Sequence, residues 1–308
     1  MLYNKFSDYL KKRYGEKVYK LPVNIPCTCP NRDGMLGSSG CIFCGDEGAG
    51  FETLPDSMEV SEQLRTNKNY IGKKYGAEKF IAYFQNYTNT YMPLETFKSY
   101  MTCACDENVA ALYISTRPDC IYEEQLEFLN GISAKHGIDV VIEIGLQSVS
   151  LQTLKFLERG HSLADFIDAV IRVKRHGLFS CAHFITDIPD DSIDDVVEGA
   201  RILSALGVDQ VKCHSLYILE GTPLGELFKR GEFEPMPLEF FIERTISFLE
   251  RLDPGIVVQR LIGRAPKERT LFCNWGTSWW KILDMIEEKM DNEGRFQGKY
   301  AGFKTSGP

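Results

Sequence analysis

Residues 140–186 read VVIEIGLQSVSLQTLKFLERGHSLADFIDAVIRVKRHGLFSCAHFIT, and this stretch decides the fold. It begins and ends with short, apolar, β-rich runs at 140–146 and 180–186. Between them lie two segments in which apolar residues recur at helical spacing, the longer at 162–176. Gly177 follows that segment, at the position where a left-handed C-terminal cap belongs. The pattern therefore predicts two strands joined by helix, which is the unit of a parallel sheet.

The same alternation continues along the rest of the chain. Further strands are predicted at 21–25, 80–85, 110–115 and 211–218, with a seventh apolar run at 256–262. The remaining helices are predicted at 57–75, 95–104, 122–136, 150–158, 192–206 and 237–252. About six βα units suit a partial or complete barrel, and a doubly wound open sheet is the competing topology. In either fold, ligands bind at the C-terminal ends of the strands.

The composition is that of an ordinary globular protein, with 44% hydrophobic and 25% charged residues among 308. No run of about 18 apolar residues suggests a membrane helix, and residues 1–17 resemble an amphipathic helix rather than a secretory signal. We therefore expect a cytoplasmic protein. The net charge of −8 argues against a long, non-specific grip on nucleic acid, which is made of Lys and Arg. Local basic patches remain at 5–20 and 260–269, and solvated surface charge explains them equally well.

Ten cysteines are many for such a chain, and in a reducing compartment clustered cysteines indicate metal ligands. The loop after the first predicted strand reads PCTCPNRDGMLGSSGCIFCGDEGAGF, in which Cys29, Cys41 and Cys44 form C-x11-C-x2-C. Three thiolates would bind three irons of a [4Fe–4S] cubane and leave the fourth iron open. A closed zinc site that adds Cys27 is the alternative, although the single residue between Cys27 and Cys29 is shorter than usual zinc spacers.

This loop resembles the cluster loop of the radical S-adenosylmethionine (SAM) superfamily, including the aromatic Phe43 before the last cysteine. Its long first spacing departs from the three residues of most members. The sequences CPNRDG and GCIFC are similar to the YtqA/YhcC-type group and to the Elongator catalytic-subunit group. The resemblance implies an α/β fold, a radical SAM partial (βα)6 TIM-like barrel with a C-terminal extension. The segments it implies are a basic N-terminal helix at 1–20, the barrel core at 21–235 and an extension at 236–308.

Further matches to the superfamily follow the strand ends. Together with Phe43, the positions that the resemblance implies as SAM contacts are Asn89, Thr90, Ser115, Gln147, Arg159 and His183. Asn89 and Thr90 stand where the family has Gly-Gly-Glu, so the residue types differ there. Arg159 has an alternative interpretation as a cation at a helix C-terminus, and His183 as a hydrogen-bonded core histidine.

The resemblance also implies a reaction. SAM bound to the open iron would be cleaved by an electron from an external flavodoxin- or ferredoxin-like donor, and the resulting 5′-deoxyadenosyl radical would abstract hydrogen from an unreactive C–H bond. Both similar groups point to the wobble uridine of tRNA, where a carboxymethylaminomethyl side chain would be trimmed to aminomethyl. The alternatives are a radical SAM enzyme with a small-molecule substrate and a zinc-stabilised RNA-binding protein without redox chemistry.

Overall fold

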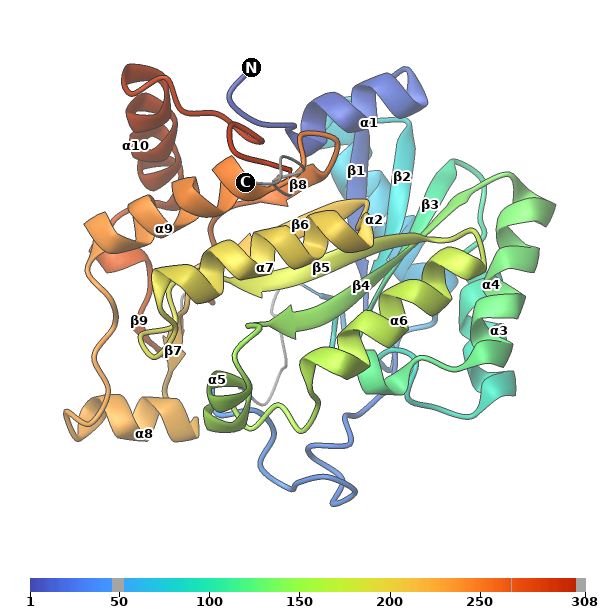
Figure 1. The fold of residues 1–308 in the computed structure, drawn as a ribbon. Coiled ribbons are helices and arrows are strands. Elements are labelled where there is room, and N and C mark those ends of the chain that lie inside the picture. The colour runs from blue at the N-terminus through green and yellow to red at the C-terminus, as the bar shows by residue number, and fades with distance from the viewer. Residues whose placement is uncertain (46–52, 267, 303–308) are drawn as a thin grey trace.

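The computed structural model describes residues 1–45, 53–266 and 268–302. Within these residues, seven parallel strands form one curved sheet in the order β1-β2-β3-β4-β5-β6-β8 (Figure 1). The strands are β1 Val18–Val23, β2 Lys79–Phe84, β3 Val109–Thr116, β4 Asp139–Gln147, β5 Phe179–Ile185, β6 Gln210–His214 and β8 Val257–Arg260. The spatial order follows the chain order without reversal, so the sheet is an open half-barrel and not a doubly wound sheet. The predicted partial barrel is confirmed.

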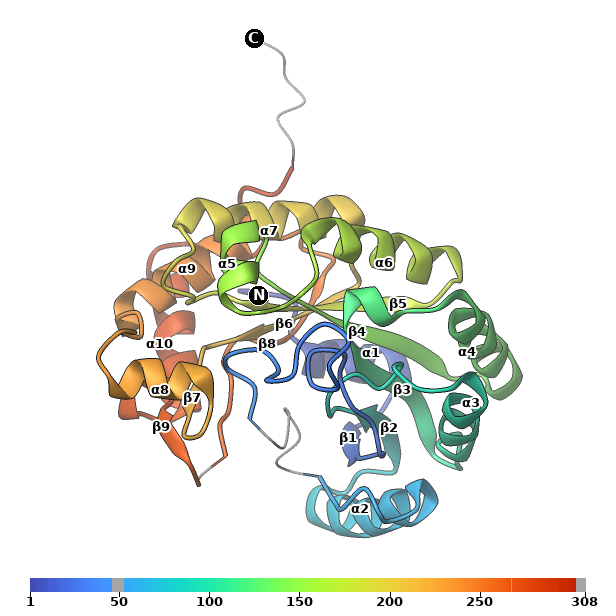
Figure 2. The same ribbon diagram turned by 90° about the horizontal axis from the view of Figure 1, so that it is seen from below.

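The longer helices cover the convex face of this sheet (Figure 2). They are α2 Val60–Tyr75, α3 Leu94–Cys103, α4 Glu123–His136, α6 Leu163–Arg175, α7 Ile193–Leu206 and α9 Leu238–Arg251. Alternate strand residues such as Leu112, Ile142 and Phe184 are fully or almost fully buried beneath them in the main core. The predicted glycine caps are confirmed, because Gly137, Gly177 and Gly207 have φ of 64°, 70° and 61°.

The concave face of the sheet is formed by the intervening residues. At its N-terminal end, Ile81, Tyr113 and Val141 pack with Leu10 of α1 (Phe6–Tyr14) in a second apolar cluster. Figure 1 shows α1 at the end of the sheet opposite the loop that carries the cysteines. Because α1 fills the N-terminal end of the half-barrel, the C-terminal end is left for the chemistry.

The segment after β6 departs from the predicted strand at 211–218. The Leu216 N–H donates to the buried carboxylate of Asp187, 2.8 Å away, instead of continuing the sheet. The chain then forms β7 (Ile218–Leu219), which pairs with β9 (Thr270–Phe272) in a separate antiparallel pair. The second half of that strand prediction is therefore wrong, because a side chain replaces the neighbouring strand as hydrogen-bond acceptor.

The remaining described elements complete the C-terminal half and one connection. They are α5 Leu151–Phe156, α8 Pro223–Lys229, α10 Trp279–Asn292 and short 3-10 turns at Pro118–Cys120 and Asn274–Gly276. The predicted extension at 236–308 supplies β8 to the half-barrel and α10, which packs on α9. None of the helices in the described ranges is long and apolar enough to cross a membrane.

Candidate functional site

The cysteine loop leaves the C-terminal end of β1 and folds back on itself. Its first turn is closed by the Arg32 N–H, which donates to the Cys29 carbonyl at 2.7 Å, and the last by the Cys44 N–H, which donates to Cys41 at 2.9 Å. Gly40 has φ of 78°, and a Cβ there would lie 2.9 Å from the Arg32 guanidinium. Glycine is therefore required at this position, where the two halves of the loop meet.

The three thiols of the C-x11-C-x2-C motif lie near one another in the folded loop. Burial raises the pKa of Cys44, and the neighbouring Cys41 and Cys29 raise it further, so the three sulfurs influence one another. Their assignment as ligands of one metal centre stays a prediction.

Cys27 contacts the loop after β2. Its Sγ lies 3.5 Å from the Asn86 carbonyl and 3.8 Å from the Asn89 side-chain oxygen. Burial raises the pKa of Cys27 to about 12, so the group is a neutral thiol. This environment favours the prediction that Cys27 is a neighbour of the metal site rather than a ligand.

Two buried guanidinium groups lie beside the cysteines. Arg159 donates from Nη1 to the Cys41 sulfur at 3.1 Å and from Nη2 to the Gly145 carbonyl at 2.9 Å. Arg117 pairs in bidentate fashion with Asp119, yet its buried Nη1 has no hydrogen-bond partner among the described residues. Burial lowers the pKa of Arg117, but Asp119, Cys29 and Cys41 together raise it above its usual value. Positive charge at this place stabilises thiolates and suits an anionic cofactor group, so the residues fit a thiolate-bound cluster with SAM.

The segment after α5 holds the cysteine loop in place. The Asn31 side-chain amide donates to the Glu158 carbonyl at 2.6 Å and contacts the Cys41 sulfur at 3.5 Å. Gly160, with φ of 68°, packs so closely that a Cβ would lie 3.0 Å from the Asn31 side-chain oxygen. The sequence LERG therefore forms the base on which the loop rests, and it places Arg159 next to Cys41.

The side chains of Asn89 and Thr90 are engaged within the protein. The fully buried Asn89 amide donates to the carbonyls of Phe84, Asn86 and Ser115 at 3.1, 2.8 and 2.9 Å. The Thr90 hydroxyl contacts the Thr116 hydroxyl and the Cys120 carbonyl. These side chains hold the ends of β2 and β3 together, and the SAM contact at this place stays a prediction.

Gln147 and Arg159 meet at the end of β4. Gln147 adopts the rare left-handed conformation, with φ of 75°. A Cβ on Gly145 would lie 2.9 Å from Arg159 Nη2 and 3.1 Å from Gln147 Nε2, so Gly145 admits both side chains. Phe43, which precedes Cys44 in the cysteine loop, is partly buried against the apolar cluster that includes Ile185. Their contacts to SAM stay predictions.

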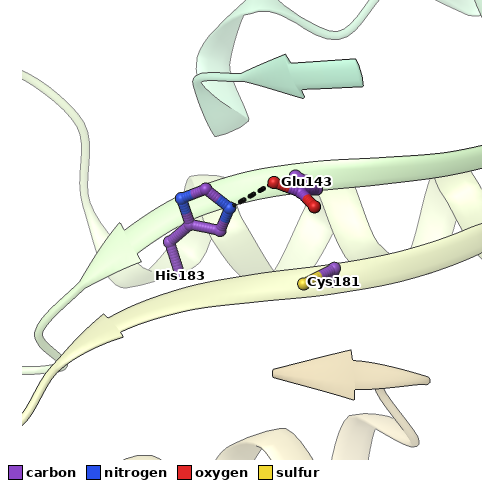
Figure 3. Close-up of side chains that lie close together, drawn as sticks. All are labelled: Glu143, Cys181 and His183. Atoms are coloured by element: carbon purple, nitrogen blue, oxygen red, sulfur yellow. Dashed lines mark hydrogen bonds and ion pairs between the residues drawn. The ribbon is translucent and has the colours of Figure 1, made fainter. Parts of the chain in front are cut away.

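Ser115 and His183 both contact Glu143 on the concave face, and Figure 3 shows the contact with His183. Glu143 is fully buried and accepts from His183 at 2.8 Å, Ser115 at 3.3 Å and the ammonium groups of Lys20 and Lys212 at 2.8 and 3.1 Å. Burial pushes the pKa of Glu143 upward, but the two lysines and His183 hold it well below its usual value. Burial, followed by Lys212, lowers the pKa of His183 to about 4, so its ring is neutral. We call these five side chains the Glu143 network.

Cys181 lies close enough to Glu143 and His183 for the three to surround one metal ion. Burial raises the pKa of Cys181 well above its usual value, and Glu143 raises it further. Both Glu143 oxygens already accept hydrogen bonds from cationic or neutral donors. A neutral thiol and an occupied carboxylate are poor metal ligands, so this group belongs to the hydrogen-bonded interior.

The sequence alone placed Lys20 and Arg13 together in a basic surface patch. Lys20 was counted in the basic patch at 5–20, but it points into the half-barrel. In the same patch, Arg13 pairs with Asp139 at 2.7 Å. The second patch, at 260–269, includes Lys267, which lies outside the described residues. The alternation of inward and outward residues along each strand was the signal that could have placed Lys20 and Lys212 inside.

An open parallel half-barrel with a cysteine loop after its first strand is the architecture of enzymes that bind an iron–sulfur cluster at the strand ends. The sequence model of the radical SAM superfamily matches residues 24–220, and that of the Radical_SAM C-terminal domain matches 208–292. The chain belongs to the radical SAM superfamily, whose members use a [4Fe–4S] cluster and SAM.

Three similar proteins place the chain within the superfamily. YtqA of Bacillus subtilis (strain 168), an uncharacterized protein, is 29% identical over 299 residues, which cover 97% of this chain and 92% of YtqA. The tRNA uridine(34) acetyltransferase of Methanocaldococcus infernus is 35% identical over 147 residues, 47% of this chain and 26% of that enzyme. A solved structure of Methanocaldococcus infernus Elp3 has the same fold, with a TM-score of 0.69 and 21% identity over 91% of this chain and 64% of that one. The predicted relation to the YtqA/YhcC and Elongator groups is confirmed.

Proposed function

We propose that this radical SAM protein modifies the wobble uridine of tRNA and converts a carboxymethylaminomethyl side chain to aminomethyl. The observation that carries the radical SAM chemistry is the folded C-x11-C-x2-C loop beside two buried guanidinium groups. The tRNA assignment is supported by the similarity to a tRNA uridine(34) acetyltransferase over about half of this chain.

The proposed ligands of the cluster are Cys29, Cys41 and Cys44. When bound, the cluster and SAM would supply a 5′-deoxyadenosyl radical that removes hydrogen from an unreactive C–H bond. Arg159 and the free Nη1 of Arg117 are placed to bind a carboxylate next to the cysteines. An external flavodoxin- or ferredoxin-like protein is proposed to supply the electron.

The concave face would position the substrate and exclude water. Apolar side chains, including Ile185 and Leu216, surround the loop end of the half-barrel. The Glu143 network lies deeper on the same face and holds its charges in a fixed, hydrogen-bonded arrangement. A site enclosed by packed strands keeps a reactive radical away from solvent and aims it at one position.

The test is nucleoside analysis, by liquid chromatography and mass spectrometry, of tRNA from cells that lack this protein. We expect carboxymethylaminomethyl uridine to accumulate and aminomethyl uridine and its descendants to disappear. The wild-type gene should restore the pattern, whereas Cys41→Ala, which loses a proposed ligand, should not. An unchanged nucleoside profile would contradict the tRNA assignment and leave the superfamily membership intact.

One observation favours a small-molecule substrate as the second candidate. The chain has a net charge of −8, and the N-terminal cations that suggested an RNA surface are engaged elsewhere. Lys5 pairs with Glu287 and Arg13 with Asp139, while Lys20 lies inside the half-barrel. Metabolite profiling of the same deleted cells tests this candidate, because a small-molecule substrate would accumulate while tRNA nucleosides stay normal.

A further inference from the structure

Strand β8 contains a bulge that turns two consecutive side chains into the half-barrel. Val258 pairs with Val211 of β6 and Arg260 pairs with Lys212, so Gln259 is an extra residue in β8. Gln259 donates to Gln210 at 2.8 Å on the concave face, and Arg260 contacts His214 on the same face. Bulges often re-aim side chains beside active sites.

Arg260 enters this interior with no acidic partner among the residues that the structure describes. Its guanidinium contacts the His214 ring through Nη2, and its buried Nε has no hydrogen-bond partner among the described residues. Glu143 is the carboxylate of the neighbouring network, and both of its oxygens are taken by Lys20, Lys212 and His183. The Arg260 side chain is half-buried and has no carboxylate partner among the described residues, which leaves its guanidinium available to an anion that enters the half-barrel.

The charges around Arg260 also favour the binding of an anion. Lys20, Lys212 and Arg260 are three cationic side chains in contact with, or beside, the single carboxylate of Glu143. The pKa of Lys212 is lowered to about 7, mainly by burial and also by the nearby Arg260 and Lys20, while Glu143 opposes the shift. Burial and Arg260 hold the pKa of His214 well below its usual value, so its ring is a neutral acceptor for the guanidinium. The cations outnumber the carboxylate, so an additional negative charge would be stabilised in this region.

We propose that Arg260, oriented by His214, binds a carboxylate of the substrate inside the half-barrel. The guanidinium fork matches a carboxylate in bidentate geometry. The subsite is separate from the cations beside the cysteines, because β5 and β6 lie between β4, next to Arg159, and β8. This inference rests on the proposed function for the identity of the ligand. In that case Arg260 binds the carboxylate of the carboxymethylaminomethyl group, and the aminomethyl product has no such carboxylate. Backbone phosphates of a tRNA lie outside such an interior, whereas an extruded base carries its substituent into it.

The first experiment measures anion binding without any tRNA. The anaerobically reconstituted protein is first loaded with SAM, so that the SAM carboxylate occupies the cations beside the cysteines. It is then heated in acetate, in inorganic phosphate and in chloride of equal ionic strength. We expect acetate to raise the unfolding temperature of the wild type but not that of Arg260→Gln. The control is Arg264→Gln, which removes the same charge from an exposed position and should be stabilised by acetate like the wild type. Because Arg260→Gln removes a half-buried charge that no carboxylate of the described residues pairs with, its unfolding temperature in chloride should equal or exceed that of the wild type.

The outcomes separate this proposal from the proposed function. Stabilisation by phosphate alone would overturn the carboxylate assignment, and equal acetate stabilisation of Arg260→Gln would overturn the subsite. A second experiment measures turnover of tRNA that carries carboxymethylaminomethyl uridine. Arg260→Gln should raise KM about tenfold to a hundredfold, the loss expected for a hydrogen-bonded charge, and Arg260→Lys should recover part of it. If tRNA is not the substrate, the acetate result still decides the subsite.

Discussion

The cysteine loop and the Glu143 network are both charged sites at the concave side of one sheet, but they are built in different ways. The loop takes most of its contacts from its own residues 27–45 and from residues 154–160, where glycines and an asparagine fix the backbone. The network takes one side chain from each of β1, β3, β4, β5 and β6, and no local motif joins them. A site that binds a cofactor is recognisable from local sequence, whereas a site that shapes the interior depends on the register of strands.

The largest expected effect is on the loop. Cys41→Ala should abolish the cluster and the reductive cleavage of SAM, because a cubane needs all three protein thiolates to stay bound. Cys27→Ala should retain both, since its sulfur is a neutral thiol next to Asn86. Iron content and visible absorption after anaerobic reconstitution measure the first property, and release of 5′-deoxyadenosine measures the second. Loss of the cluster in Cys27→Ala with retention in Cys29→Ala would show that the ligands are assigned wrongly.

The next effect tests whether the network is held by its charge. Glu143→Gln leaves Lys20 and Lys212 without their counter-ion in a fully buried position, so we expect the free energy of unfolding to fall by about 3 kcal/mol. Urea denaturation of the apoprotein measures the change. The matched control is Glu198→Gln, which removes an exposed carboxylate paired with Arg201 and should change stability by less than about 0.5 kcal/mol. Equal effects of the two substitutions would argue that the buried charge contributes nothing.

A pH titration distinguishes the network further. The folded-state pKa of His183 is lowered to about 4, mainly by burial and then by Lys212, from the ordinary histidine value of 6.5. Between these values the unfolded chain binds a proton that the folded protein does not, so stability falls as the pH drops from 6.5 to about 4. His183→Gln should lose this contribution, which is at most about 1.4 kcal/mol per pH unit. Denaturation curves at several pH values give the difference in slope, and parallel curves would mean that His183 does not titrate as described.

The smallest expected effect concerns the N-terminal helix. Lys12 is exposed on α1, at the end of the sheet opposite the cysteine loop (Figure 1). Lys12→Glu should therefore change the affinity for tRNA less than about twofold, with an unchanged dependence on salt. Filter binding at several salt concentrations measures both. A clear loss of affinity for tRNA, with a weaker dependence of binding on salt, would show that α1 contacts the RNA. Both ends of the half-barrel would then bind the same substrate.

Much of the fold followed from local pattern. The helices at 162–176 and 192–206 were predicted within one residue of their ends, because apolar periodicity and glycine caps are local signals. The division of the strand predicted at 211–218 was not visible, because the competing acceptor for the Leu216 N–H is Asp187, a residue far away in sequence. Asn89 and Thr90 were predicted as SAM contacts, and only the structure revealed that their side chains connect β2 and β3.

The sequence by itself determined the superfamily, the parallel α/β architecture and the three cysteines that we propose as cluster ligands. These properties depend on residue spacing within short segments, which can be read directly from the sequence. Only the tertiary structure decided that Lys20 and Lys212 neutralise Glu143, that Arg159 contacts Cys41 and that a bulge brings Arg260 beside His214. Such contacts depend on which strands become neighbours and in which register, and a one-residue shift turns a side chain from the interior to the opposite face.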